Sequence, residues 1–172
     1  HADMRELLDR LRRRPGVEAV SMSQNSFPYN GSNSGMDVRL DTMESKYNIR
    51  RWVTPDFFRV FRYQGANGET PEQLAALLKE GTFMVSRNVF ESRYKIDLKD
   101  YVGKEFCLDQ DTAHLSKLVA ALQVVRYDDF SSGAYSRSAV ILLPENRLAS
   151  GNEICLRTNK NESAAFAEQL MK

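Results

Sequence analysis

The chain is organised around one stretch, Ile49-Arg-Arg-Trp-Val-Thr-Pro-Asp-Phe-Phe-Arg-Val-Phe61, which is the densest apolar cluster in the sequence. Its first five residues alternate in the period-2 pattern of a strand, with Ile49, Arg51 and Val53 on one face. Thr54 is a favoured N-cap, and the Pro-Asp pair after it suits a first helical turn. The stretch therefore predicts a strand that runs directly into a helix.

The helix predicted after Thr54 carries a strongly apolar face. Phe57, Val60 and Phe61 share that face, and Phe58 lies beside it. The segment contains no nucleophile, no histidine and no metal-ligand spacing. We therefore interpret it as a core nucleus, which specifies the architecture of the domain and not its chemistry.

Composition sets broad limits on the function. The chain has 172 residues, 42% of them hydrophobic, which is enough for one large domain or two small ones that share a core. The formal net charge of +1 gives no support for nucleic-acid binding. A basic cluster is formed by Arg10, Arg12, Arg13 and Arg14. It is typical of the solvated last turn of a helix, and the alternative is a basic contact patch.

The rest of the chain alternates irregularly between helical and strand-like patterns. Helices are predicted over residues 2–14, 54–63, 70–81, 87–95 and from 161 or 163 onward. Strands are predicted over residues 17–23, 36–40, 49–53, 82–86, 104–109, 117–126, 138–143 and 153–157, with a turn over 41–45. Because strands and helices do not alternate strictly, the pattern favours an α+β fold over a doubly wound sheet.

Two cysteines, Cys107 and Cys155, each lie in a strand-like run and form no CxxC motif. They are either two buried thiols or one disulfide that closes a long loop. The apolar strand patterns favour buried free thiols, because cysteine there behaves as a small hydrophobic residue.

Few residues suggest chemistry. Besides the terminal His1, the only histidine is His114, in a polar turn near Asp109 and Asp111. That set lacks the further ligands of a zinc or calcium site, so a solvated turn is expected. There is no nucleophile elbow, phosphate loop or dinucleotide fingerprint. The sequence therefore predicts no enzyme, no catalytic residue, no cofactor and no metal.

The polar loop over residues 24–35 contains two aromatic residues that need an explanation. Phe27 and Tyr29 flank Pro28 among Asn, Ser and Gly. They either pack back onto the domain or form exposed contacts to a partner. Phe27, Pro28 and Tyr29 are therefore the candidate partner-contact residues.

Six motifs in order resemble one family. They are Arg14-Pro-Gly-Val-Glu-Ala-Val-Ser21, Val53-Thr-Pro-Asp-Phe-Phe58, Phe83-Met-Val-Ser-Arg-Asn88, Asp100-Tyr-Val-Gly-Lys104, residues 117–129 and residues 140–144. This order resembles the MacB-like periplasmic core domain of FtsX-type ABC transporter permeases. The sequence departs from the family at Ala120-Ala121, where a Gly is frequent, and around residues 64–69, where a Gly-Arg is common.

The resemblance implies an architecture and a set of partners. It implies two subdomains: a membrane-proximal helix-strand part with βαβ-like character (residues 1–45 and 145–172) and an inserted β-rich part (residues 46–144). The helices at both ends would continue into flanking transmembrane helices of the permease, so the sequence is expected to be a piece of a longer protein. Further partners would be an ABC ATPase subunit or domain and a periplasmic adaptor or lipoprotein, in a dimeric full-length protein.

The resemblance also implies a function. The fragment would lie in the periplasm of a bacterium, as part of an inner-membrane protein, and would transmit ATP-driven conformational change to a partner or substrate. ATP hydrolysis would belong to a separate nucleotide-binding domain. The alternative is an extracytoplasmic ligand-binding or sensor module, which a polar-lined pocket would favour. A hydrolase that uses His114 is a third alternative, without a nucleophile to support it.

Overall fold

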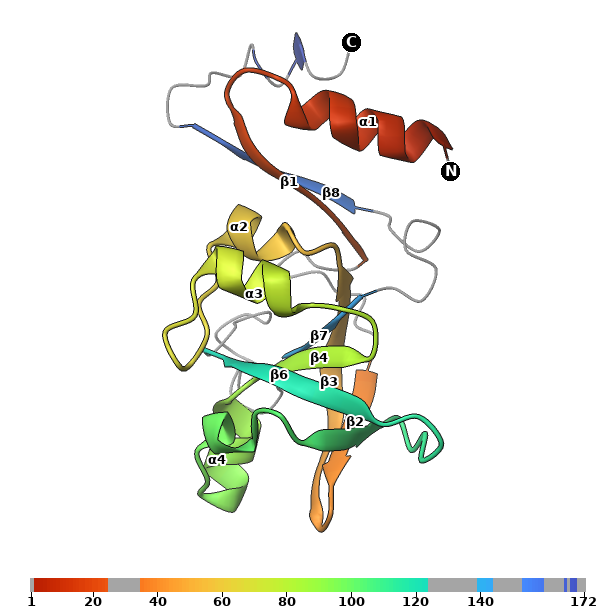
Figure 1. Ribbon diagram of the computed structural model, residues 1–172, viewed down its shortest axis with the longest axis vertical. Coiled ribbons are helices and arrows are strands. Elements are labelled where there is room, and N and C mark those ends of the chain that lie inside the picture. Colours follow the sequence, from red (N-terminus) through yellow and green to blue (C-terminus); the bar gives the residue numbers. More distant parts are fainter. Residues whose placement is uncertain are drawn as a thin grey trace.

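The computed structural model describes residues 2–24, 35–123, 139–143 and 153–159, together with Phe166, Glu168 and Gln169. These residues form a mixed fold in which a sheet is flanked by short helices, so the α+β class is confirmed (Figure 1). The predicted last helix lies almost entirely outside the described residues. Among the described residues, no helix has the length and apolarity that crossing a membrane requires.

The elements follow the predicted order. The helices are α1 (Ala2–Arg12), α2 (Phe57–Phe61), α3 (Pro71–Leu77), α4 (Asn88–Tyr94) and a short 3₁₀ helix, η1 (Leu98–Tyr101). The strands are β1 (Val17–Gln24), β2 (Gly35–Leu40), β3 (Met43–Val53), β4 (Thr82–Ser86), β5 (Glu105–Leu108), β6 (Ser116–Leu122), β7 (Ala139–Leu142) and β8 (Glu153–Thr158).

Six of the strands close into a barrel. The hydrogen-bonded order of the sheet is β2-β5-β6-β4-β7-β3-β1-β8, and β2 also pairs with β3. That extra pairing joins the two ends of the β2-to-β3 series. The β3–β7 and β4–β6 pairs are parallel, and the remaining pairs in the ring are antiparallel. Closure satisfies the backbone groups of these strands and leaves the ring without an edge strand.

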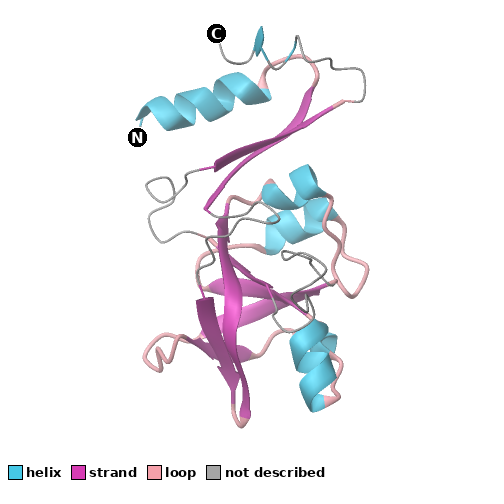
Figure 2. Ribbon diagram, turned by 180° about the vertical axis from the view of Figure 1, so that it is seen from behind, coloured by secondary structure: helices cyan, strands magenta, loops and turns pink. Residues whose placement is uncertain are grey.

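Strands β1 and β8 extend from the barrel. β1 pairs with β8 from Val17 to Ser23 but meets β3 only where Ser23 lies opposite Val53 and Gln24 opposite Trp52. Figures 1 and 2 show α1 together with β1 and β8 at one end of the molecule, while the barrel forms the other end. The elements nearest the two ends of the sequence therefore lie side by side.

Alternating side chains build two apolar cores on the two faces of the barrel strands. One core fills the barrel interior; among its members are Val38, Phe83, Val85, Phe106 and Leu118. The other lies outside, where Phe57, Phe58 and Leu74 of α2 and α3 pack on Met84, Ala120 and Ile141. The period-2 pattern of the strands thus decides which side chains face inward.

The stretch Ile49–Phe61 confirms the predicted face and corrects the predicted cap. Ile49, Arg51 and Val53 are buried, and even Arg51 is 0% exposed. The helix, however, begins only at Phe57, and its N-cap Asp56 makes no side-chain capping bond. Thr54 does not cap the helix, because its hydroxyl accepts a hydrogen bond from the Met22 N–H of β1.

The largest error in the predicted elements concerns β3. A turn was expected over residues 41–45 and a strand only from Ile49, yet β3 begins at Met43. The polar residues Ser45 and Asn48 are buried in this strand, where the Ser45 hydroxyl donates to Asn48 Oδ1 at 2.7 Å. Local apolarity does not reveal a strand whose buried positions are polar.

The predicted division into two subdomains remains a prediction. The bounds 1–45 with 145–172 place β2 in the membrane-proximal part, whereas β2 pairs with β3 and β5 of the barrel. Contacts of α1 and β8 with β1 bring together elements from the first and last parts of the chain.

Candidate functional site: the open end of the barrel

The two ends of the barrel differ. At one end, α4 and η1 follow β4 and precede β5, and their side chains Phe90 and Leu98 are fully buried against the interior core. At the other end, β2, β4 and β6 begin and β3, β5 and β7 finish. A cavity of about 540 Å³ lies at this second end, and all six strands contribute residues to its wall. We refer to it as the mouth cavity.

The part of the mouth cavity that meets the interior core is apolar. Met36, Leu108 and Leu142 line it, and each belongs to or packs against the interior core. Because aromatic rings such as those of Phe83 and Phe106, whose centroids are 5.4 Å apart, fill the barrel below, the cavity has a closed floor. The mouth cavity is therefore a blind pocket and not a channel.

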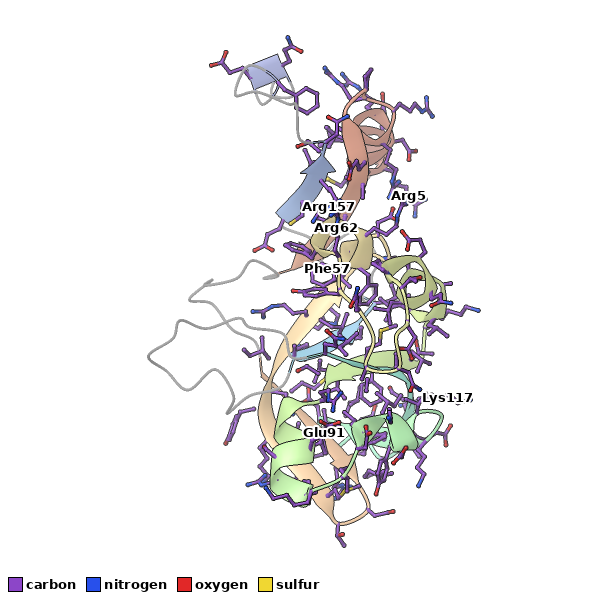
Figure 3. All side chains as sticks on the ribbon, turned by 90° about the vertical axis from the view of Figure 1, so that its left-hand side faces the viewer. Arg5, Phe57, Arg62, Glu91, Lys117 and Arg157 are labelled. Carbon is purple, nitrogen blue, oxygen red and sulfur yellow. The ribbon has the colours of Figure 1, made fainter. Side chains whose placement is uncertain are left out.

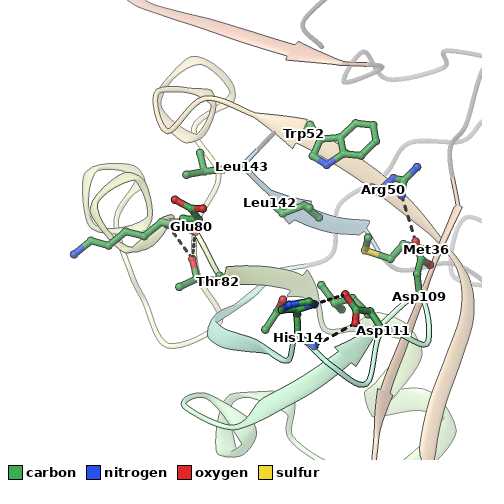
Figure 4. Close-up of a pocket in the computed structure, with 14 residues that line it drawn as sticks. Met36, Arg50, Trp52, Glu80, Thr82, Asp109, Asp111, His114, Leu142 and Leu143 are labelled. Carbon is green, nitrogen blue, oxygen red and sulfur yellow. Dashed lines mark hydrogen bonds and ion pairs between the residues drawn. The ribbon is translucent and has the colours of Figure 1, made fainter. Parts of the chain in front are cut away.

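One wall of the mouth cavity carries a stacked cation and indole. The Arg50 guanidinium lies 4.1 Å from the centre of the Trp52 ring, and its Nη1 is 3.3 Å from Asp109 Oδ2 (Figure 4). Asp109 also accepts a hydrogen bond from the Asp37 N–H at 2.8 Å. Trp52 Nε1 is buried and has no acceptor among the described residues. Buried indole N–H groups normally have a partner.

The rim of the cavity includes the polar turn that holds His114. The ring Nδ1 lies 3.2 Å from Asp111 Oδ2, and the His114 side chain is 85% exposed. The solvated turn predicted from the sequence is confirmed. Desolvation raises the pKa of Asp111, but hydrogen bonds from the His114 ring and from the N–H groups of His114 and Ala113 outweigh it and hold the pKa below its usual value. Among the described residues, no three potential metal ligands come together.

A second feature is the junction between the barrel and the group formed by α1, β1 and β8. The Thr54 N–H donates to the Met22 carbonyl at 2.9 Å, beside the hydroxyl contact already described. Arg12 of α1 reaches Asp56 at 3.6 Å, and Arg62 reaches Glu18 of β1 at 3.8 Å. Beside these polar contacts, Val60 and Phe61 of α2 pack on Ala19 of β1 and Cys155 of β8 in a small apolar cluster. The two ends of the molecule are therefore joined by polar contacts and by one apolar cluster.

The junction is also hollowed on one side. A cleft of about 520 Å³ runs between α1 and the α3–β4 turn, with Leu8, Pro55, Leu78 and Leu143 at its base. On the other side, the Arg157 Nε of β8 donates to the Val60 carbonyl at 2.8 Å. Figure 3 shows Arg62 and Arg157 in this region. The basic cluster at the end of α1 is exposed or half-buried, and Arg12 is its member in contact with the barrel side.

The predicted site residues have different outcomes. Cys107 and Cys155 are free and buried, which confirms the expected thiols. The candidate contact residues Phe27, Pro28 and Tyr29 lie outside the described residues. Sequence reasoning missed the Arg50–Trp52 pair, although the alternation in Ile49–Val53 already places both side chains on the face opposite the buried one.

Comparison with known proteins identifies the fold. No protein-family model matches the sequence, and no curated protein matches it. Solved structures do match. The extracellular domain of the noncanonic ABC-type transporter YknZ from Gram-positive bacteria superposes with a TM-score of 0.61 at 14% identity, over 97% of this chain and 77% of that one.

Two further structures agree. The periplasmic region of MacB from Actinobacillus actinomycetemcomitans has a TM-score of 0.60 at 9% identity, over 95% of this chain and 68% of that one. A domain of a putative permease protein from Porphyromonas gingivalis has a TM-score of 0.62 at 13% identity, with coverages of 95% and 65%. The chain therefore has the fold of the extracytoplasmic domains of ABC transporter permeases, and the resemblance of its motifs is confirmed at the level of fold.

Proposed function

We propose that the chain is the extracytoplasmic domain of an ABC transporter permease and that it transmits ATP-driven conformational change to a partner or substrate outside the membrane. The fold shared with three such domains carries this proposal. Because a fold alone does not establish a function, the arrangement of this chain's own elements supplies the second support.

That arrangement suits a domain inserted between two membrane helices. The elements nearest both ends of the sequence pair with each other: β1 and β8 run antiparallel, and the Asn159 N–H donates to the Gly16 carbonyl at 3.0 Å. The barrel projects away from them. In the proposal, α1, β1 and β8 face the membrane and the barrel faces the periplasm of a bacterium.

The junction offers a route for transmitting motion. It includes a short β1–β3 pairing, the Thr54–Met22 hydrogen bonds, ion pairs such as Arg12–Asp56, and the small apolar cluster of α2 with β1 and β8. Exposed ion pairs contribute little to stability, typically about 0–1 kcal/mol each. In the proposal, the barrel and the α1–β1–β8 group move as packed bodies in a hinge or shear motion, with the ion pairs exchanging and the small apolar cluster as the pivot.

The proposal assigns no chemistry to this domain. ATP hydrolysis belongs to an ABC ATPase subunit or domain, and the remaining partners are the flanking transmembrane helices and a periplasmic adaptor or lipoprotein. The full-length protein is proposed to be a dimer.

Phe27, Pro28 and Tyr29 remain the proposed partner contact. Replacing Phe27 and Tyr29 by Ser in the full transporter should impair transport without lowering expression. An early melting transition of the isolated double variant would instead identify these rings as part of the core.

Cross-linking at the junction tests the transmission proposal. In the full-length transporter, Glu18→Cys with Arg62→Cys would be bridged by a short, reducible thiosulfonate cross-linker, because these two side chains meet across the junction. Bridging should stop transport while ATP still binds, and reduction should restore transport. Each single cysteine variant, treated in the same way, is the control. Full transport by the bridged protein would exclude motion at this junction.

The alternative, a ligand-binding module, is favoured by a specific observation. The mouth cavity combines an apolar floor with polar groups on its wall, which is the usual composition of small-molecule sites. A domain of a permease can also carry such a site, so the two functions do not exclude each other.

A further inference from the structure

The mouth cavity has the position, size and lining of a ligand site. From its geometry we propose that it binds a neutral amphiphile, a small molecule whose apolar chain carries an amide or carbonyl oxygen. The apolar chain lies on Met36, Leu108 and Leu142, and the oxygen accepts a hydrogen bond from Trp52 Nε1. This site is independent of the transporter assignment, because it is built entirely from the barrel.

Size and position support a site. The mouths of β-barrels are preferred places for ligands, and such sites span about 300–1,000 Å³. The cavity of about 540 Å³ lies within that range. It is closed below by the packed interior and by the fully buried Phe90 and Leu98 at the far end. A ligand therefore enters and leaves by the open end only.

The apolar floor selects an apolar chain. Met36 is 7% exposed and Leu108 is 9% exposed, and Leu142 comes from the strand across the barrel from them. Met36 and Leu108 have little area left to cover, so the gain of roughly 25 cal/mol per Å² comes mainly from the apolar chain of the ligand as it leaves water. Methionine adds adaptability, because its flexible thioether adjusts to differently shaped ligands.

Trp52 selects a hydrogen-bond acceptor. Trp52 lines the same cavity, and its Nε1 is buried and has no acceptor among the described residues. The proposal therefore includes a small turn of the indole that brings Nε1 to the ligand. A buried donor without a partner costs free energy, and a ligand oxygen would remove that cost. Arg50 already covers one face of the indole, so a ligand meets Trp52 at its other face or at the edge that bears Nε1.

The charges around the cavity select against ions. Three carboxylates, from Glu80, Asp109 and Asp111, stand against the two permanent cations Arg50 and Lys79. Arg50 is already paired with Asp109. A carboxylate or phosphate on the ligand would meet a surplus of negative charge. An ammonium would lose its hydration above an apolar floor, while Asp109 and Asp111 are already held by Arg50 and His114. A neutral polar group avoids both costs.

The single tryptophan of the chain makes the test direct, because fluorescence excited at the red edge of tryptophan absorption, where tyrosine hardly absorbs, reports only on Trp52. The probes are octanamide, octanoate and octylamine, which share nearly the same chain length and differ in charge. Octanamide should shift the emission to shorter wavelength in a saturable manner. Octanoate and octylamine should bind at least about tenfold more weakly, because the site would have to desolvate a charge.

Two variants locate the binding. Ser116 lines the cavity, and Ser116→Phe should fill it and abolish the octanamide response. Its neighbour Leu115 is 48% exposed and does not line the cavity, so Leu115→Phe is the matched control and should respond like the native chain. Trp52→Phe removes the donor; by calorimetry it should weaken octanamide binding by about tenfold, the value of one buried hydrogen bond.

Three results would overturn the proposed site. The first is the absence of a saturable shift with octanamide in the native chain, and the second is equally tight binding of all three probes. The third is octanamide binding by a Ser116→Phe variant that is folded by its thermal melt. Should Ser116→Phe fail to fold, the Trp52→Phe calorimetry decides: unchanged affinity for octanamide excludes the assigned hydrogen bond.

Discussion

Thr54 and Met22 are joined by two hydrogen bonds that run in opposite directions. The Thr54 N–H donates to the Met22 carbonyl at 2.9 Å, and the Met22 N–H donates to the Thr54 hydroxyl at 3.0 Å. The pair continues the β1–β3 ladder by one step after β3 has ended at Val53. A threonine side chain therefore completes the pairing that connects the barrel to β1.

This relationship predicts a sharp difference between two substitutions. Thr54→Val keeps the shape of the side chain but leaves the Met22 N–H without its acceptor, which should cost about 1–3 kcal/mol of unfolding free energy. Thr54→Ser keeps the hydroxyl and should cost less than about 1 kcal/mol. Urea denaturation measures both. Equal stabilities of the two variants would show that the hydroxyl does not hold the junction.

Two substitutions in α2, Phe57→Ala and Phe61→Ala, should differ in how much they destabilise the domain. Phe57 is 0% exposed and contacts the rings of Phe58, Phe61 and Tyr63, so Phe57→Ala should destabilise the domain by about 3–5 kcal/mol. Phe61 is only half-buried, and Phe61→Ala should cost less, about 1–2 kcal/mol. Thermal or urea unfolding provides the comparison. A Phe57→Ala melt indistinguishable from the native one would mean that α2 is peripheral.

The predicted elements succeed where the signal is local. At the start of the helix predicted over residues 70–81, Thr70 and Gln73 form a capping box: Thr70 Oγ1 accepts from the Gln73 N–H, and Gln73 Oε1 accepts from the Thr70 N–H. The strand Thr82–Ser86 has the predicted bounds. In both cases neighbouring residues alone determine the structure.

The fold fails to follow from the sequence where distant segments meet. The closed barrel depends on the parallel pairing of Ile49–Trp52 with Ala139–Leu142. No local pattern encodes that pairing. The same is true of the mouth cavity, which takes one or more side chains from each of six strands. Thr54 illustrates the limit within a single residue: its type suits a helix cap, and only the neighbouring β1 decides that it bonds to a strand.

The two cysteines predict a distinct pattern of thiol reactivity. Cys107 and Cys155 are 7% and 5% exposed, so both should react slowly with a thiol reagent in the native domain. After denaturation without reducing agent, two thiols per chain should react rapidly. With a reagent that releases a coloured thiolate for each protein thiol, the absorbance gives the number of reactive thiols per chain. Fewer than two thiols in the denatured, unreduced chain would contradict the free state of both residues.

Asp111 predicts a measurable change in titration. Desolvation raises its pKa, but the His114 ring and the two backbone N–H groups lower it further, so the folded pKa lies below the unfolded one. The stability that this carboxylate contributes is present above the unfolded pKa and is lost as pH falls through the folded pKa. In His114→Ala, the pKa of Asp111 should therefore rise toward its usual value.

Carboxyl carbon shifts followed by NMR across an acid titration measure this pKa. Asp97 is the internal control: desolvation raises its pKa, hydrogen bonds from Lys99 outweigh that and lower it, and His114 plays no part. Its titration should be the same in both proteins. An unchanged Asp111 curve in the variant would show that the ring does not interact with the carboxylate in solution.

The position of β7 within the barrel has a consequence for how the domain folds. β7 lies between β3 and β4, although it follows both by more than fifty residues along the chain, and β8 completes the pairing with β1. Such non-local pairings form slowly, because closing a long loop costs entropy before any contact compensates for it. During synthesis, the first 138 residues contain five of the six barrel strands and lack β7, and they contain β1 without its partner β8. The domain thus remains open, and accessible to chaperones, until its last strands emerge.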